Sequence, residues 1–570
     1  MRSYLTYLLI FIFCMVMPVS SHAWTRSTSN VPCDNSLYRD LDKLVAFGLV
    51  EPPIVGQRPY PRSEFARMTA EAIRNFEKNE ADAARAESLD EFIKRSKRSR
   101  ETKIVLERLE DEFQEELIDM GAAPGERMRY RLHPFEKINF YATYLNSPPT
   151  TIPVNNGRGS INAVINPLKD YDLGRHPIDG FLNAEELVGR FQAGRFISGY
   201  ARSRFEVDMY RTDDMTGHAY LQNGYATFKA GNFSMEVGRD SMLWGFGERG
   251  SLLYSTNARP LDGFWLTNPT PARLPWVFKY LGRWRYTLYA ANFGPGYSRK
   301  WAWLAGYKLS LAPAKYVELG FGHVVQIGGE GMPTPSAIDV IGEFFGFRPA
   351  GTDPSSPNLS NHSFEIDYMV RIPQLRGVML YGNIAIEDKW KSIKKTLKQG
   401  CSYLWGIYLP AINPSGSADL RIEYVKTSPL QYRHGLYSDG WTLNRRIIGS
   451  DAGPDADAVH ALFRKTISPK IWYGVTFGWD YRRSDTYTEL VNPNGTAGDV
   501  VKIASGPTEQ RLRGLFDIDW QMKKHLGLHL TLGYERVGNL NFQQGVDRNN
   551  YLGGLEIKLD LDRYFAFARN

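Results

Sequence analysis

Regular alternation of apolar and polar residues constrains the fold of this chain more than any other feature. After Gly121 the sequence leaves a helical period and takes up a period of two. In one such stretch Phe364 and Ile366 alternate with Glu365 and Asp367. A period of two places successive side chains on opposite faces of a β-strand. The alternation recurs to the C-terminus, so most of the chain is predicted to form strands with one apolar and one wet face.

Connection lengths separate a membrane barrel from a soluble sandwich, because both show this alternation. Eight short links are predicted near residues 194–197, 231–232, 282–283, 312–314, 373–374, 413–417, 468–470 and 523–525. Nine mostly long links are predicted at about 147–185, 211–218, 240–274, 293–300, 327–361, 387–400, 427–456, 484–507 and 539–548. Outer-membrane barrels have short periplasmic turns and longer external loops. The sequence therefore predicts an all-β transmembrane barrel of about 18 antiparallel strands over residues 126–570.

The first residues indicate export from the cytoplasm. Arg2 precedes an apolar run from Leu5 to Met17, and Ser21 and Ala23 supply the small residues of a cleavage site. We expect residues 1–23 to be a signal peptide and the mature chain to begin at Trp24. A membrane anchor is the alternative, but it needs roughly 20 apolar residues. No later apolar run is that long, and a barrel is the other way to cross a bilayer. The expected location is the outer membrane of a Gram-negative bacterium.

Residues 24–125 carry a helical pattern and are predicted to form a separate domain. Leu37, Leu41 and Leu44 share one face of a first helix, and Gly48 stands where a helix end favours positive φ. Ser63 is expected to cap a second helix, and a third, charged helix is expected from about 89 to 120. An even strand number puts both ends of the barrel at the periplasm. This domain is therefore expected to be periplasmic.

No motif for catalysis, cofactor binding or metal binding stands out. The run from Gly245 to Gly250 matches a dinucleotide fingerprint by letter but lacks the βαβ context. The histidines lack zinc spacing, and no serine lies in a known nucleophile motif. We therefore expect no enzyme activity, no cofactor and no metal; a close Ser–His pair at the membrane boundary would argue for a barrel hydrolase. A net charge of +7 does not indicate nucleic-acid binding. Cys33 and Cys401 are expected at opposite ends of the barrel and unpaired.

The predicted external loops combine aromatic and basic residues. Aromatic faces stack on sugar rings, and Arg and Lys pair with the carboxylates of acidic polysaccharides. The candidate residues are Trp244, Tyr297, Arg299, Trp301, Trp303, Lys391, Lys394, Lys395 and Lys398. For any single Trp near a strand end, a place in the membrane-interface girdle is an equal alternative. The wet faces of two strands carry mixed charge, including Arg202, Glu206, Arg511 and Asp517. Such density is typical of an obstructed lumen, with a clear aqueous channel as the competing interpretation.

Two stretches resemble the Wzi capsule assembly family of outer-membrane proteins. The first is Leu41–Val50 followed by Arg58–Ala66, and the second is Gly238–Gly247 leading to Leu252–Pro260. The family's Trp-Pro-Leu stretch is replaced here by residues 58–61. The resemblance implies an 18-stranded surface lectin with a periplasmic helical bundle that holds capsular or other exported polysaccharide. It also adds Arg249 and Arg259, beside Trp244, to the candidate binding residues.

The first stretch also resembles an S-layer homology module, which supports an alternative function. In that interpretation the protein is a cell-wall-tethered porin. A porin conducts ions in planar bilayers, whereas a plugged lectin barrel does not. The expected partners are capsular or extracellular polysaccharide and outer-membrane lipids, with peptidoglycan or other capsule-export proteins as further candidates and no nucleic acid. The loop from Asp240 to Ala272 is expected to be external, with Glu248 accessible from outside the cell.

Overall fold

The computed structural model describes residues 26–51, 54–83, 89–175, 178–212, 214–249, 251–273, 276–346, 360–387, 400–491 and 497–568. Among these residues no helix is both long and apolar enough to cross a membrane. The predicted signal peptide, residues 1–23, lies outside the described residues. So does the lysine cluster between 391 and 398.

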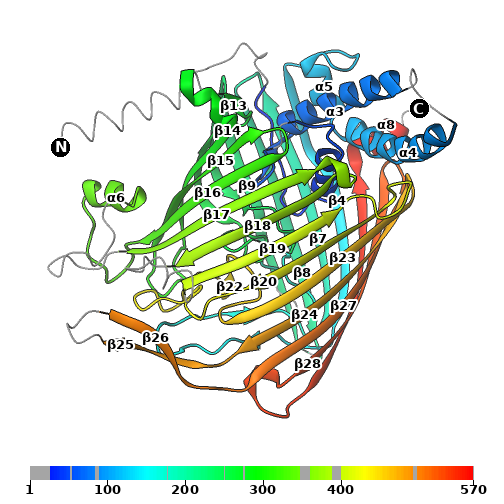
Figure 1. The fold of residues 1–570 in the computed structure, drawn as a ribbon. Helices are drawn as coiled ribbons and strands as arrows, with labels where there is room; N and C mark the ends of the chain where they lie inside the picture. The colour runs from blue at the N-terminus through cyan, green and yellow to red at the C-terminus, as the bar shows by residue number, and fades with distance from the viewer. Residues whose placement is uncertain are drawn as a thin grey trace.

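Eighteen antiparallel strands close into one barrel (Figure 1). They are β4 (Tyr130–Leu145), β7 (Gly180–Ala193), β8 (Ile197–Tyr210), β9 (Met215–Ala230), β10 (Phe233–Asp240), β12 (Leu261–Thr267) continued by β13 (Ala272–Arg273), β14 (Arg283–Asn292), β15 (Trp303–Ala314), β16 (Val317–Ile327), β17 (Ser360–Ile372), β18 (Val378–Glu387), β19 (Cys401–Leu409), β20 (Ala418–Lys426), β23 (Ala456–Ser468), β24 (Ile471–Arg483), β27 (Thr508–Lys523), β28 (Leu526–Gly538) and β29 (Arg548–Asp560). The last strand pairs with the first, with Ile557 opposite Phe140. The predicted barrel and its strand number are confirmed.

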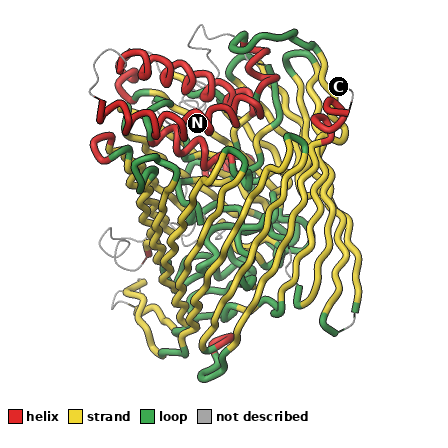
Figure 2. Tube along the Cα trace, turned by 90° about the vertical axis from the view of Figure 1, so that its right-hand side faces the viewer, coloured by secondary structure: helices red, strands yellow, loops and turns green. Residues whose placement is uncertain are grey.

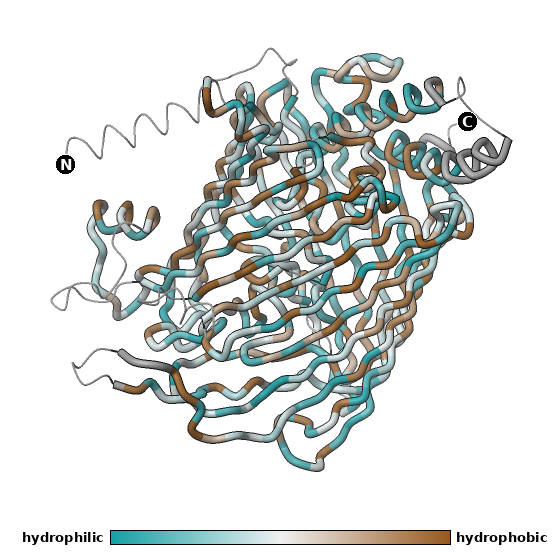
Figure 3. Tube along the Cα trace, viewed as in Figure 1, coloured by the Kyte–Doolittle hydropathy of each residue, from teal (hydrophilic) through white to brown (hydrophobic). Residues whose placement is uncertain are grey.

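Hydrophilic and hydrophobic residues alternate along strands of the wall (Figure 3), and this alternation gives the wall two different faces. On β15, Lys308 and Ser310 point inward and are fully buried, whereas Trp303 and Tyr307 lie on the outward face. Outward positions of neighbouring strands expose Phe321 and other apolar side chains. Closure of the sheet pairs the backbone N–H and C=O groups between strands, so none is left unpaired in lipid. Together with the apolar outward side chains, this makes the wall suited to a bilayer.

One stretch of the strand map was predicted wrongly. Residues 240–274 were expected to form one long loop, but β12 and β13 occupy 261–273. The two pieces flank a break at Asn268, where prolines at 269 and 271 interrupt the ladder. The Asn268 side chain bridges the break: its Nδ2 donates to Trp284 O at 3.1 Å and its Oδ1 accepts from Tyr286 N at 2.7 Å. A side chain thus replaces the missing backbone bonds, which an alternation pattern does not reveal.

Helices gather at the end of the barrel that carries the short turns (Figures 1 and 2). They are α2 (Leu37–Ala46), α3 (Arg62–Ala83), α4 (Leu89–Glu112), α5 (Gln114–Met120) and the C-terminal α8 (Leu561–Ala568). Gly48 has φ 75° after α2, as predicted. The expected third helix is divided at Phe113, whose ring is buried and stacks on Phe65 with centroids 4.9 Å apart. By the usual rule for outer-membrane barrels, the end with short turns faces the periplasm.

Segments from both ends fold into the barrel and share its core. From the helical end, β1 (Asn30–Val31) pairs with β3 (Tyr60–Pro61), and β2 (Gln57–Arg58) pairs with β11 (Leu243–Trp244). From the other end come two further ribbons, β5 (Thr150–Thr151) with β6 (Val164–Ile165), and β21 (Thr442–Leu443) with β22 (Arg446–Ile447). One hydrophobic cluster contains buried residues from the helices, from these segments and from the wall. A hairpin, β25 (Thr486–Val491) with β26 (Ala497–Ala504), extends beyond the wall at the loop end (Figure 1).

Candidate functional site

The interior of the barrel is braced by charge pairs. Glu186 on β7 is fully buried and forms ion pairs with Arg175 at 2.7 Å, Arg202 at 2.8 Å and Arg204 at 2.9 Å. Arg175 comes from a loop, whereas the other two arginines come from the neighbouring strand β8. The Glu186 carboxylate therefore joins a loop, through Arg175, to two positions on the neighbouring strand. This arrangement is the obstructed interior that mixed charge on the strands favoured, rather than an open channel.

The N-terminal segment is fastened to the wall from inside. Glu318 on β16 is fully buried and accepts backbone N–H bonds from Val55 at 2.7 Å and Gly56 at 3.0 Å. Arg285 on β14 donates to the carbonyls of Gln57 and Pro59 at 2.9 and 3.0 Å. Charged side chains of the wall thereby satisfy backbone groups that would otherwise be buried without partners.

Residues 241–260 also fold into the barrel, which corrects the expectation that this segment is external. Trp244 is 1% exposed and meets Tyr254 and Tyr289 edge-on, with centroids 4.8 and 5.7 Å away. Its strand β11 pairs with β2 of the helical end. We call the segments that fold into the barrel from its two ends the plug. Trp244 is a packing residue at its centre, and no sugar can reach it from outside in this conformation.

Two charged residues of the same segment form ion pairs inside the barrel. Glu248 forms an ion pair with Arg39 of α2. The prediction that Glu248 is accessible from outside the cell is therefore wrong. Burial acts to raise the pKa of Glu248, but the positive charges of Arg39 and Arg421 outweigh it and lower the pKa to about 2. Arg249 forms an ion pair with Asp170 and lies over Tyr171, 5.0 Å from the ring centroid.

Arg259 is the most open of the three residues suggested by the family motif. About a third of its side chain is exposed, and its guanidinium lies 3.6 Å from Asp262. Trp244 and Arg249 thus act within the plug, whereas Arg259 stands at its margin. The structure brings the three into one segment but not onto one accessible surface.

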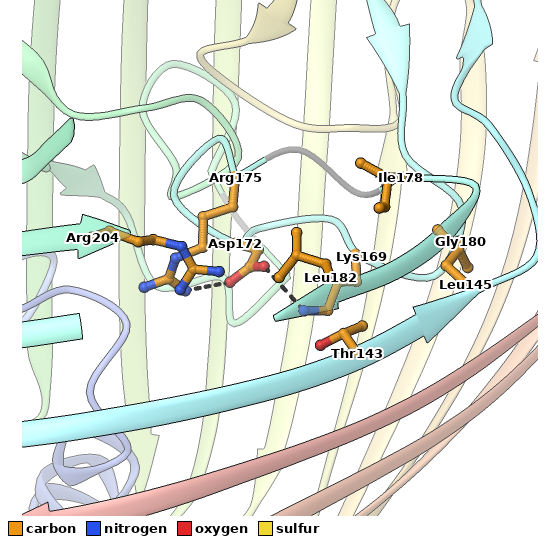
Figure 4. A pocket seen from close by; sticks show the side chains of 9 residues that line it. All are labelled: Thr143, Leu145, Lys169, Asp172, Arg175, Ile178, Gly180, Leu182 and Arg204. Carbon is orange, nitrogen blue, oxygen red and sulfur yellow. Dashed lines mark hydrogen bonds and ion pairs between the residues drawn. The ribbon is translucent and has the colours of Figure 1, made fainter. Parts of the chain in front are cut away.

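Two pockets inside the barrel are each too small for a sugar. One pocket lies between β4, β7 and the loop that carries Asp172 and Arg175, and these charged side chains pair with one another across it (Figure 4). Its cavity volume is about 10 Å³, room for roughly one water molecule. A second pocket, between Trp244 and Arg58, measures about 40 Å³. Neither volume accommodates a sugar ring.

Two external loops that carry aromatic and basic candidates are joined to each other. Tyr297 donates to Gly440 O at 2.6 Å, and Arg299 Nε donates to Leu436 O at 3.2 Å. The loop of residues 293–302 is thereby joined to the loop of residues 427–455. Tyr297 is buried by this contact, Arg299 is half-buried, and Trp301 is 59% exposed. Trp301 is therefore the aromatic residue that presents a face to solvent here.

Trp301 adopts a strained backbone conformation. Its φ is +62°, a region that residues with a side chain rarely enter. Its N–H donates to Gly294 O at 3.0 Å, which closes the turn. Trp303, two residues on, is 47% exposed on the outward face of β15, in the position of an interface girdle. The two tryptophans thus face different surroundings.

Two exposed basic residues on these joined loops were not among the candidates. Lys300 is half-exposed and pairs with Glu330 at 3.1 Å. Arg445 lies on the exposed turn between β21 and β22, where Nε donates to Asn162 at 3.2 Å. The sequence marked both loops as external, but it gave no sign that residues about 145 positions apart would share one surface.

Comparison with known proteins decides the family. The family model described as capsule assembly protein Wzi matches residues 172–552. The chain belongs to this family. The resemblance read from the two sequence stretches is thereby confirmed.

Two relatives of this Wzi-family chain illustrate the range of similarity. Wzi of Escherichia coli, an outer-membrane protein involved in group 1 capsule assembly and described as a carbohydrate-binding β-barrel, superposes with a TM-score of 0.62. The match covers 94% of this chain and 99% of that structure at 17% identity, so it establishes the fold. An uncharacterized 55.8 kDa protein in the cps region of Klebsiella pneumoniae is 27% identical over 175 residues. That match spans 30% of this chain and about a third (34%) of the relative.

Family, fold and surface agree on the location of the protein. A closed barrel with an apolar outward face is the form in which β-proteins cross the outer membrane. This Wzi-family chain is an outer-membrane protein. The predicted location is confirmed.

Proposed function

We propose that this protein binds capsular or other extracellular polysaccharide at its external surface and attaches it to the cell, without chemical conversion. The observation that carries the proposal is a barrel filled from both ends, which leaves the joined external loops as the accessible surface. Membership of the capsule assembly family supports it. So does the likeness to the E. coli Wzi barrel, which is described as carbohydrate-binding.

We place the binding surface around Trp301, with Arg299 and Lys300 in the same loop and Arg445 on the loop joined to it. The exposed indole offers a flat apolar face for a sugar ring. The three cations suit the carboxylates of an acidic polysaccharide. The lysines at 391, 394, 395 and 398 remain candidates, and they lie outside the described residues. Trp303 is assigned to the membrane interface instead.

The close Ser–His pair that would argue for a hydrolase exists, but its surroundings favour a structural role. Ser360 Oγ lies 3.0 Å from His362 Nε2 on β17. The same nitrogen lies 2.6 Å from Glu343, and Ser360 also donates to Glu343 at 2.7 Å. Ser360 is 2% and His362 8% exposed. Since Glu343 occupies both partners and burial excludes a substrate, we assign this cluster to packing.

The wall-tethered porin is the alternative, and the filled lumen weighs against it. A porin needs a continuous water path, whereas here loops, N-terminal segment and wall share one hydrophobic cluster. We infer that residues 24–125 act as a periplasmic domain that closes the barrel, after removal of residues 1–23. Other capsule-export proteins and peptidoglycan are the partners that such a domain could contact.

The test is binding of the purified, folded protein to the extracellular polysaccharide of its own host. Immobilised protein should retain this polysaccharide, and the Trp301→Ala variant should retain it more weakly. In parallel, planar bilayers that contain the protein should show no steady ionic conductance. Steady conductance without polysaccharide retention would favour the porin and contradict the proposal.

A further inference from the structure

Helix α6 (Ala337–Phe344) lies outside the barrel, in the connection between β16 and β17 (Figure 1). Its C-terminal end is attached to the outer wall. Phe344 and Phe345 pack on Tyr307 with centroids 5.6 and 6.1 Å away, and Phe344 O lies 3.1 Å from His323 Nδ1. Tyr307 occupies an outward position on β15, so the helix covers the face of the wall that otherwise meets lipid.

The strand positions beneath α6 carry polar side chains on this outward face. On β16 the outward row runs from Leu319 and Phe321 to His323, and on β17 it runs from Ile366 to His362. His323 and His362 stack with centroids 5.2 Å apart and are joined at 3.0 Å between Nε2 and Nδ1. Polar groups facing hydrocarbon are costly unless they have partners. They therefore require cover.

Helix α6 covers these polar side chains and provides an acidic partner for them, Glu343. Glu343 is 5% exposed and turns toward the wall, where it contacts His362 and Ser360. Ile338 and Ile341 lie on the side of the helix away from Glu343 and are 59% and 43% exposed, and Val340 is 41% exposed. A loop helix in water buries its apolar face and exposes its polar one. In α6 the acidic Glu343 is buried against the wall, while three apolar side chains stay exposed.

We propose that α6 lies in the outer leaflet of the membrane, with Ile338, Val340 and Ile341 in contact with lipid acyl chains. The argument for lipid is continuity with the lipid-facing wall. The outward rows that end beneath α6 continue as exposed Leu319, Phe321 and Ile366, which a bilayer must cover. The apolar side of α6 extends this band sideways. Its N-terminal end stays polar, since Ser336 and Asp339 form an exposed capping box.

This inference is independent of polysaccharide binding. It concerns an apolar surface that is separate from the proposed polysaccharide-binding surface. It also explains the Ser360–His362–Glu343 cluster, which attaches α6 to the wall. The cluster buries the polar groups of the wall against the single acidic edge of α6. The helix then presents only apolar side chains to its surroundings along that face.

The test places a fluorescent label in the full-length protein in vesicles. With Cys14, Cys33 and Cys401 replaced by Ala, single cysteines are introduced as Ile341→Cys and, separately, Ile338→Cys, and labelled with bimane. Both side chains are already exposed, so labelling leaves the packing intact. Ile366→Cys on the wall is the lipid-facing control, and Val546→Cys on an external turn is the aqueous control. Folding is checked by heat-modifiable migration on a gel.

The vesicles contain either phosphatidylcholine or its dibrominated form. Bromine quenches bimane in contact with acyl chains, so labels at 341 and 338 should lose at least half as much intensity as the label at 366. Quenching by aqueous iodide but not by brominated lipid, as expected at 546, would overturn the proposal. So would cross-linking of Ile341→Cys to the same residue of a second copy, because that result would mean that protein covers the helix.

Discussion

Arg39 of helix α2 and Glu248 of the segment between β10 and β12 form an ion pair inside the barrel. Arg39 enters from the helical end, and Glu248 belongs to a connection that leaves the wall at the opposite end. The backbone N–H groups of Glu248 and Arg249 donate to Glu423 on β20 at 2.7 and 3.0 Å. The two parts of the plug therefore meet each other and the wall at one place. Each part helps to hold the other.

Removal of Asp42 should loosen this junction. Asp42 is 3% exposed and accepts from Arg421 at 2.9 Å and from Arg58 at 3.3 Å. Asp42→Ala leaves two buried arginines without this partner, which typically costs about 3–5 kcal/mol. We expect the free energy of unfolding, measured by guanidinium titration in detergent micelles, to fall by an amount of that order.

The matched control for Asp42 is an exposed pair in the same helical region. Lys103 and Glu107 lie 4.0 Å apart and are more than half exposed. Lys103→Ala should change the free energy of unfolding by less than about 1 kcal/mol. Equal effects of the two substitutions would show that the Asp42 contacts do not hold the plug.

Accessibility from outside the cell should separate the two candidate segments. Lys300 is half-exposed on the external surface, whereas the side chain of Glu248 is 16% exposed inside the barrel. Lys300→Cys should react with an impermeant maleimide on intact cells, and Glu248→Cys should react only after denaturation. Labelling of both on intact cells would mean that residues 241–260 leave the lumen in the membrane.

Much of the fold could be predicted because strands and turns are local. Period-two runs such as Phe364–Ile372 identified the wall, and turns at 194–197 and 231–232 lie where β7, β8, β9 and β10 meet. Whether a loop folds into the barrel or away from it depends on residues that are distant in the sequence. Glu248 has the same letters around it whether the segment faces solvent or Arg39, because the partners come from residues about 200 positions away. Burial of Trp244 was therefore outside the reach of sequence reasoning, although the motif that contains it was recognised.

The loop of residues 427–455, which folds into the barrel from the external end, should be held less tightly as pH rises through neutrality. Burial and the neighbouring Asp170 carboxylate raise the pKa of Asp451, on a loop between β20 and β23, to about 7. Its other charged neighbours are Arg513 and Asp480, and Tyr171 donates to it at 2.7 Å. An unfolded Asp titrates near 4, so the folded state binds the extra proton between pH about 4 and 7. The stabilisation is complete below pH about 4 and is lost as pH rises through about 7.

The measurement is the heat-induced transition on a gel at pH 5 and pH 8. The wild-type midpoint should be lower at pH 8, and Asp451→Asn should reduce this difference because the residue no longer ionises. Ser438→Ala, an exposed change in the same loop, should keep the difference unchanged. A wild-type midpoint that is the same at both pH values would contradict the assignment to Asp451.

Trp301 and Trp303 provide the sharpest test of the binding surface, because they are two residues apart and similarly exposed but face different surroundings. Trp301 projects from the external turn at φ +62°, and Trp303 lies on the outward face of β15. Loss of one stacking contact is worth roughly 0.5–1.5 kcal/mol, or about 2- to 12-fold in affinity. Trp301→Ala should weaken polysaccharide retention by that factor at low and high salt alike, because stacking is not screened by ions as exposed charge pairs are. Trp303→Ala should leave retention unchanged while the barrel still folds. Equal losses in both variants would place the effect in the barrel rim rather than in a sugar contact, and no loss in either would move the site to another part of the external surface.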